Sequence, residues 1–180
     1  MLRSGAIKRS RFTPDGDEVI AGFAFAGETI GLESIEGGMP DERFVALEST
    51  RLCEVPWENV EATMAQDPRV RDAVNRLLRE EINRSREQLI RACRGTARQR
   101  VAAFLLDVGR RRRERRLNDV RIRLAMGRRE MAAYLNLTLE TVSRTISQLR
   151  REGMIAVEGR RLELLDIAGL GDIAEGLSSP

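Results

Sequence analysis

Residues 127–152 decide the fold, and they read Gly-Arg-Arg-Glu-Met-Ala-Ala-Tyr-Leu-Asn-Leu-Thr-Leu-Glu-Thr-Val-Ser-Arg-Thr-Ile-Ser-Gln-Leu-Arg-Arg-Glu. Their apolar residues recur at helical spacing in two short segments, which could share one apolar seam. That seam consists of Met131, Leu135, Val142, Ile146 and Leu149. Thr138 precedes the second segment as an N-cap residue would, and Gly153 follows it where a left-handed residue often ends a helix. The pattern predicts a helix-turn-helix.

The second predicted helix carries three polar side chains in its first turn and a half. Glu140, Ser143 and Arg144 fall at positions i, i+3 and i+4, so they share one face. In a helix-turn-helix this part of the helix enters the major groove. Arginine can donate two hydrogen bonds to guanine, glutamate can accept one from cytosine, and serine can bond either way. The triplet therefore predicts base contacts to double-stranded DNA, and the alternative is a solvated polar face on an ordinary surface helix.

The segment that follows has the pattern of a β-hairpin. Residues 154–165 alternate as two short strands around Glu158-Gly159-Arg160, which places a glycine at the turn. A helix-turn-helix followed by such a hairpin is winged.

Residues 68–94 predict one long helix with few breakers. One stripe recurs at spacings of four and three, as in a coiled-coil seam. It consists of Leu78, Ile82, Ser85, Leu89 and Ala92. A second stripe, Val70, Val74 and Leu77, is placed to pack against the preceding domain. The helix is thus predicted to be a dimer interface, and the alternative is an amphipathic helix buried within one subunit.

The first third of the chain predicts antiparallel β structure. Residues 6–55 hold short β-rich runs, broken by turn signals at 14–17, 26–28 and 37–41.

Together these segments resemble the CRP/FNR family of bacterial transcription regulators over nearly the whole length of the chain. Residues 139–144, Leu-Glu-Thr-Val-Ser-Arg, are similar to the recognition-helix signature of the FNR/FixK branch. The resemblance implies an α+β fold. Its parts would be a partial antiparallel β-roll of the cyclic-nucleotide-binding type (1–66), a long dimerisation helix (67–95) and a C-terminal winged helix-turn-helix DNA-binding domain (96–180).

The implied function is that of a sequence-specific transcription regulator, an activator that reads a TTGAT-like palindrome as a homodimer. RNA polymerase would be a further partner, with the loop around residues 15–17 and the β-roll surface as candidate contacts. The expected DNA-binding residues are Glu140, Ser143, Arg144, Thr138, Thr141, Arg128 and Arg129. The last two begin the first helix of the motif, where backbone phosphates usually pass. Oxygen or redox state is the signal that the resemblance implies for a full-length form.

The resemblance also indicates that the β-roll starts in its middle, with roughly 70 residues fewer than in a typical member. Truncation, a start codon placed too late and a genuine short isoform are the three explanations. Losing strands would leave unpaired edges, so residues 1–55 are expected to be poorly stable alone. The alternative function is a truncated interaction module that dimerises with full-length regulators through residues 68–94 and senses nothing itself.

Cys53 falls where the oxygen-sensing branch has the fourth ligand of an iron–sulfur cluster. A cubane cluster needs four thiolates, and Cys93 matches no ligand of the family, so no cofactor is expected in the chain as given. A 4Fe-4S cluster is expected only in a full-length form, with cysteines from a preceding segment. The alternative for Cys53 is a small buried hydrophobe on a strand.

The resemblance argues against cyclic AMP as a ligand. The family's phosphate pocket needs a glutamate directly after the glycine at position 31 and an Arg-Ser pair further on. Here those places hold Leu32, Arg43 and Phe44. Glu33 is displaced by one residue, which leaves a ligand in a reshaped pocket open.

Composition sets the remaining bounds. A chain of 180 residues with 33% charged residues suits two small domains, and no apolar stretch is long enough to span a membrane. Two cysteines and no signal peptide indicate the reducing cytoplasm. The chain has no histidine, and it shows no nucleophile-plus-base arrangement or glycine-rich phosphate loop, so an enzyme is not expected.

The net charge of +3 hides a concentration of arginine in the second half. The run at 110–116 follows a helix that is expected to end near Val108. It predicts phosphate contacts, which would make affinity depend on salt. The alternatives are a solvated loop and an effect of genome composition, since lysine is nearly absent.

Overall fold

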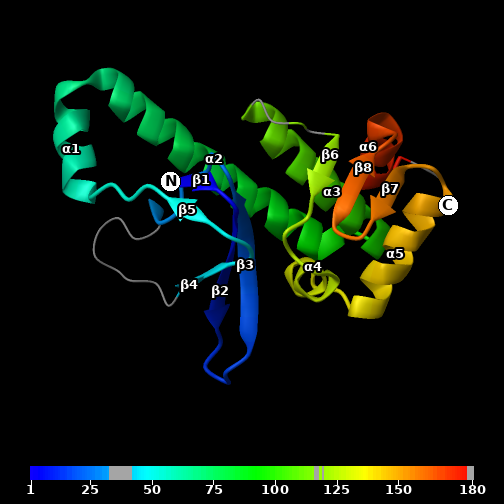
Figure 1. Ribbon diagram of the computed structural model, residues 1–180. Coiled ribbons are helices and arrows are strands. Elements are labelled where there is room, and N and C mark those ends of the chain that lie inside the picture. The colour runs from blue at the N-terminus through cyan, green and yellow to red at the C-terminus, as the bar shows by residue number, and fades with distance from the viewer. Residues whose placement is uncertain (33–41, 116–117, 119, 178–180) are drawn as a thin grey trace. The chain divides into compact units, whose positions relative to one another are not determined.

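The computed structural model describes residues 1–32, 42–115, 118 and 120–177, without the side chains of 88 and 91–94. The chain divides into two compact units, Met1–Leu89 and Ile90–Pro180 (Figure 1). Both units combine helices with antiparallel sheets, which confirms the predicted α+β class. None of the helices among the described residues has the length and apolarity needed to cross a membrane.

The first unit contains two small sheets and two helices within its described residues. A three-stranded sheet has the order β3-β2-β4, and β1 pairs with β5. The elements are β1 (Leu2–Ser4), β2 (Ala6–Phe12), β3 (Glu18–Phe25), β4 (Glu42–Ala46), β5 (Arg51–Leu52), α1 (Trp57–Gln66) and α2 (Pro68–Arg94), of which residues 90–94 belong to the second unit. All described strand pairs of the chain are antiparallel, as predicted.

Two of the three predicted turns are confirmed. Between β2 and β3, the amide of Thr13 donates to Asp17 O, and Gly16 takes the positive φ of 89° that a tight turn requires. After β3, the amide of Glu28 donates to Phe25 O at 3.0 Å and closes the turn at 26–28. The third predicted turn, at 37–41, lies outside the described residues.

The long helix α2 presents one face to its own unit. Val74 is buried, while Val70 and Leu77 are half-buried, so the second predicted stripe packs within the unit. The small core of the sheets consists of Leu2, Ile7 and Ala24, with Ile30 against it.

The second unit places two further helices around the helix-turn-helix and its sheet. Its elements are α3 (Ala97–Glu114), β6 (Arg121–Arg123), α4 (Arg128–Leu135), α5 (Leu139–Arg151), β7 (Ile155–Glu158), β8 (Arg161–Leu164) and α6 (Ile167–Glu175). The strands follow the order β6-β8-β7. The predicted hairpin is confirmed, and β6 widens it into a three-stranded sheet.

The core of this unit contains the predicted seam. All five residues of the seam are buried, with exposed fractions between 0% and 9%. Leu105 of α3, Leu162 of β8 and Leu170 of α6 are also buried, so every layer contributes to one core. Burial of that many large apolar side chains is the main stabilising term for the unit.

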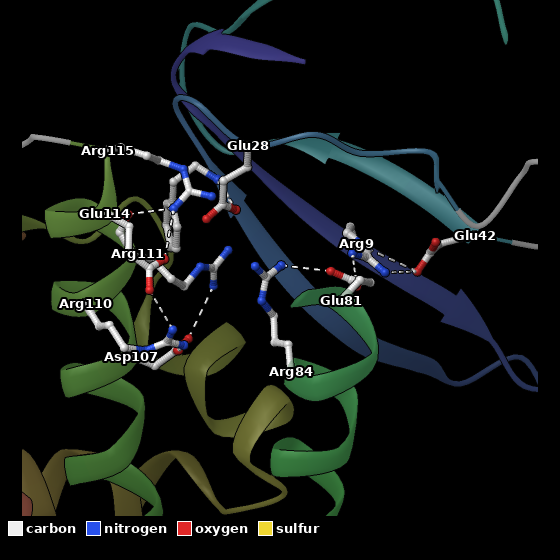
Figure 2. Close-up of polar contacts among 11 residues, drawn as sticks. Arg9, Glu28, Glu42, Glu81, Arg84, Asp107, Arg110, Arg111, Glu114 and Arg115 are labelled. Carbon is white, nitrogen blue, oxygen red and sulfur yellow. Dashed lines mark hydrogen bonds and ion pairs between the residues drawn. The ribbon is translucent and has the colours of Figure 1, made fainter. Parts of the chain in front are cut away.

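The expectation that α3 ends near Val108 is wrong, because the helix continues to Glu114. Arg110 lies 2.5 Å from Asp107 Oδ1 and 2.8 Å from Glu114 Oε1, and Arg111 is buried with Nη1 3.5 Å from Asp107 (Figure 2). Arginine favours helices, and carboxylates three or four residues away offset the charge of the run. The start of the arginine run is therefore helical rather than a solvated loop.

Candidate nucleic-acid interface

The first helix of the motif, α4, has defined ends. The amide of Gly127 donates to the Glu130 carboxylate at 2.8 Å and so satisfies a free donor at the N-terminus. At the other end Asn136 adopts a left-handed conformation, with φ 52° and ψ 51°. Leu137 then donates to Ala132 O at 2.9 Å, which closes the helix end. Asparagine tolerates this conformation better than most residues, so the tight turn can be made here.

The second helix, α5, begins and ends as the sequence predicts. The Thr138 hydroxyl accepts from the amide of Thr141 at 3.1 Å and contacts the Thr141 hydroxyl at 2.8 Å. Gly153 takes a φ of 73° after the helix, and Met154 donates to Leu149 O. Both threonine hydroxyls predicted to bind DNA thus already have a role inside the motif.

The outer face of α5 carries the predicted base-reading triplet. Glu140, Ser143 and Arg144 are exposed, while the opposite face is buried. Within the described part of the chain, none of these three side chains has a hydrogen bond or ion pair in the structure. Leu139 at the first helical position is also 45% exposed, beside Glu140. Leu139 was not among the predicted DNA-binding residues, although it is the first residue of the segment that resembles the recognition-helix signature.

Two arginines begin α4, and their surroundings differ. Arg129 is exposed, whereas Arg128 is half-buried, and this burial lowers the pKa of the Arg128 guanidinium below its ordinary value. An arginine remains a cation at neutral pH even so. Neither side chain has an ion-pair partner among the described residues, so both can donate hydrogen bonds to a phosphate.

The wing brings two further arginines to the start of α4. Gly159 makes the hairpin turn with a φ of 58°, and Arg160 donates to Ala125 O at 3.2 Å. A cavity of about 110 Å³ is lined by residues that include Gly127, Arg128, Gly159, Arg160 and Arg161. Sequence reasoning missed Arg160 and Arg161, which directly follow the turn glycine that it had identified. Three of the residues that line this small cavity are arginines, and a cluster of cationic side chains favours an anionic occupant.

The first unit does not present a complete metal site in its described residues. Cys53 is half-buried after β5, and its backbone pairs with that of Met1. Among the residues that the structure describes, no group of three or more His, Cys, Asp or Glu could hold an ion. A cubane cluster requires four thiolates, so the described residues do not fit one.

Residues at the places of the family's phosphate pocket do not form such a pocket with their described neighbours. Arg43 lies on β4 and is exposed, with its guanidinium carbon 5.6 Å from the centre of the Phe12 ring. Phe44 is 38% exposed. Arg43 is thus accounted for as a surface side chain stacked on an aromatic ring.

Comparisons with known proteins match both units. A Crp-like helix-turn-helix domain matches residues 99–173, and a cyclic nucleotide-binding domain matches residues 1–67. The transcriptional activator protein Anr of Pseudomonas aeruginosa is 35% identical over 175 residues, which cover 97% of this chain and 72% of Anr. The fumarate and nitrate reduction regulatory protein of Escherichia coli is 33% identical, covering 96% of this chain and 69% of that protein. The structure of FixK2 from Bradyrhizobium japonicum matches with a TM-score of 0.84 and 28% identity, covering 96% of this chain and 85% of FixK2.

Proposed function

Given that this chain belongs to the CRP/FNR family of DNA-binding transcription regulators, in its FNR/FixK branch, we propose that it reads a TTGAT-like palindrome as a homodimer. The relatives are regulators, and so is this chain, rather than an enzyme. The matches to a cyclic nucleotide-binding domain and a helix-turn-helix domain favour transcription regulation over the alternative of an interaction module.

The observation that carries the proposal is the free face of α5. Glu140, Ser143 and Arg144 project from a helix that is capped at its start and buried along its other side. Because these side chains have no partner in the described residues, they lose no internal contact when they meet base edges. Arginine to guanine and glutamate to cytosine are geometrically matched pairs in the major groove.

Contacts to backbone phosphates would position the protein on the DNA. Arg128 and Arg129 at the start of α4 and the wing residues Arg160 and Arg161 can each meet a phosphate. We propose that the cavity between α4 and the wing turn seats one such phosphate. Thr138 and Thr141 would contact the DNA through the outer surface of their side chains, because their hydroxyls already bond each other.

The dimer would form through the first stripe of α2. Ile82 and Leu89 are 52% and 66% exposed, which is unusual for large apolar side chains on a helix whose other face is already packed. Leu78 is half-buried and Ser85 exposed, and the side chain of Ala92 lies outside the described residues. A two-fold axis along this stripe would match two DNA half-sites about one helical turn apart.

Activation and its signal complete the proposal. As an activator the regulator would contact RNA polymerase, with the turn at Asp15–Asp17 as one contact, and it would act in the cytoplasm. Oxygen or redox state would be the signal, with Cys53 joined by cysteines from a longer form of the protein in a 4Fe-4S cluster. Iron and sulfide analysis of such a longer form tests this part separately.

The decisive experiment is binding of the chain to a labelled TTGAT-N4-ATCAA duplex and to a scrambled duplex across a salt series. We expect a clear preference for the palindrome with two chains per duplex. Equal affinity for both duplexes at every salt concentration would contradict the proposal.

Three variants test the dimer contact and the phosphate contact separately. Leu89→Asp should abolish the two-chain complex, whereas Leu177→Asp, at a leucine that is 69% exposed in the second unit, should not. Arg129→Gln should weaken binding to both duplexes alike and reduce the salt slope by about 1.

A further inference from the structure

Arg100 of α3 contacts two distant places in the second unit with one guanidinium group. Its Nε donates to Gly95 O at 2.8 Å, in the two-residue joint between α2 and α3. Its Nη1 donates to Leu135 O at 3.2 Å and to Asn136 O at 3.3 Å, at the turn of the helix-turn-helix. We infer that Arg100 is a positioning residue that couples the conformation of the joint to that of the turn, and hence to the recognition helix α5.

The turn is where such a contact has most effect. Carbonyl groups at a helix C-terminus lack partners within the helix and form the negative end of its dipole. Arg100 supplies both a donor and a positive charge to the C-terminus of α4. Asn136 holds a left-handed conformation there, and α5 begins only three residues later, at Leu139. The direction in which α5 leaves the turn therefore depends on the groups that Arg100 holds.

Hydrogen bonds also fix the conformation of the joint. Thr96 caps α3 by accepting from the amide of Gln99 at 3.2 Å, and the Gln99 side chain accepts from the amide of Thr96 at 2.7 Å. The amide of Arg100 itself donates to Thr96 O at 2.9 Å. A displacement of Gly95 and Thr96 thus moves both the backbone and the guanidinium partner of Arg100.

The shape of arginine suits this double contact. The guanidinium is a rigid planar fork with donors on different edges, so Nε and Nη1 can serve different carbonyl groups at once. A lysine offers one compact ammonium group and cannot span both places. Two residues earlier, Arg98 lies 2.7 Å from Glu152 at the far end of α5, which makes it a matched comparison within the same turn of α3.

The test is a double-mutant cycle read by amide hydrogen exchange in the intact chain without DNA. The reporter amides are those of Asn136 and Leu137, which donate to Ala133 O and Ala132 O within the turn. Thr96→Ala disturbs the joint, and Arg100→Met removes the proposed coupling. The amide of Leu164, bonded to Val120 O in the wing sheet, controls for a general loss of stability.

We expect Thr96→Ala to speed exchange of the reporter amides by about tenfold, a factor that corresponds to about 1.4 kcal/mol. In the Arg100→Met background the same change should have less than about a twofold effect, because non-additivity is the signature of coupled sites. Arg100→Lys should behave like Arg100→Met, whereas Arg98→Met should leave the response to Thr96→Ala intact. An equal effect of Thr96→Ala in both Arg100 backgrounds, or none in either, would overturn the inference.

The consequence for DNA rests on the proposed function and is measured separately. Arg100→Met should lower the ratio of palindrome to scrambled affinity by about tenfold while affinity for scrambled DNA stays the same. If the unaltered chain showed no preference for the palindrome, the proposed function would fail while the exchange cycle still decided the role of Arg100.

Discussion

Arg9 of β2 places its Nη1 2.8 Å from Oε1 of Glu81 on α2, and these two residues are separated by 72 positions in the chain. Figure 2 shows the Arg9 guanidinium between Glu81 and Glu42, whose side chain is 2% exposed and lies 3.4 Å away. Glu81 also binds Arg84 at 2.8 Å within the helix. This chain of charges ties the three-stranded sheet to α2 next to Ile82, a residue of the proposed dimer face.

Replacing Arg9 should therefore loosen α2 on the sheet. Arg9→Met removes the cation beside a buried carboxylate, and we expect the free energy of unfolding to fall by about 2–3 kcal/mol. Urea denaturation followed by circular dichroism measures it. Arg11→Met is the matched control, because Arg11 is an exposed arginine on the same strand, and it should change stability by less than about 0.5 kcal/mol. Similar losses in the two variants would show that the network contributes little.

A second prediction concerns acid stability. The Glu18 carboxylate accepts from Lys8 at 3.0 Å and from Ser10 at 2.7 Å, and these bonds, the Lys8 bond first, lower the pKa of Glu18 below 4.5. A carboxyl group with a lower pKa in the folded state stabilises the fold above its unfolded pKa, and this contribution disappears as pH falls through the folded value. Glu18→Gln should thus destabilise the chain at neutral pH and make the loss of stability below about pH 4.5 shallower.

The size of this effect is limited by solvent, because the Glu18 side chain is 35% exposed. We expect at most about 1 kcal/mol at neutral pH, measured by urea unfolding across a pH series. Asp15→Asn, at an exposed carboxylate in the same hairpin, is the control. The free energies of unfolding of Glu18→Gln and of the unaltered chain would differ by the same amount from neutral to acid pH if the ionised carboxylate were not the source of the stability.

How much of this could be read from the sequence depends on how local each feature is. The helix-turn-helix was predictable because its seam, the Thr138 cap and the left-handed Gly153 are signals within one short stretch. The Arg9–Glu81 pair could not be found this way, since no periodicity connects two residues so far apart. Strand β6 has three residues, too few to show an alternation, and it becomes a strand only by pairing with β8.

The end of α3 could not be predicted for a related reason. The run of arginines at 110–113 favours a helix end before it. In the structure Asp107 and Glu114 offset the positive charge of the run, so the helix continues. For the outer face of α5, the sequence predicts which residue types could contact bases, and the structure shows which of these side chains are exposed. Base contacts and the domain limits 1–66, 67–95 and 96–180 stay predictions.

The turn of the helix-turn-helix offers a third prediction. Asn136 has a φ of 52°, a conformation that costs most residues roughly 1–2 kcal/mol. Asn136→Ala should therefore lower the thermal unfolding midpoint, whereas Asn136→Gly should leave it nearly unchanged, since glycine accepts this φ freely. Equal destabilisation by both variants would instead assign the stabilising role to the asparagine side chain.

A fourth prediction addresses Arg144. Arg144→Ala should cost roughly 1–3 kcal/mol of binding to the palindrome and relax the preference for guanine at one position per half-site. Competition with duplexes altered at single positions measures both effects. Arg150→Ala, at an exposed arginine in the last turn of α5, should leave the base preference intact. Equal losses of Arg144→Ala on palindromic and random DNA would make Arg144 a phosphate contact instead.

The last prediction concerns Leu139, whose exposed apolar side chain precedes Glu140 at the start of the recognition helix. Apolar side chains in the major groove contact the methyl group of thymine, and deoxyuridine lacks that methyl group while it keeps the same hydrogen-bonding edge. Replacing the half-site thymines one at a time by deoxyuridine should weaken binding at one position. Leu139→Ala should weaken binding to the thymine duplex by a similar factor and make the chain insensitive to that replacement. Leu165→Ala, at another exposed leucine, should keep the full sensitivity. If Leu139→Ala also retained it, the leucine would not be what distinguishes thymine, and base discrimination at the start of α5 would depend on its polar residues alone.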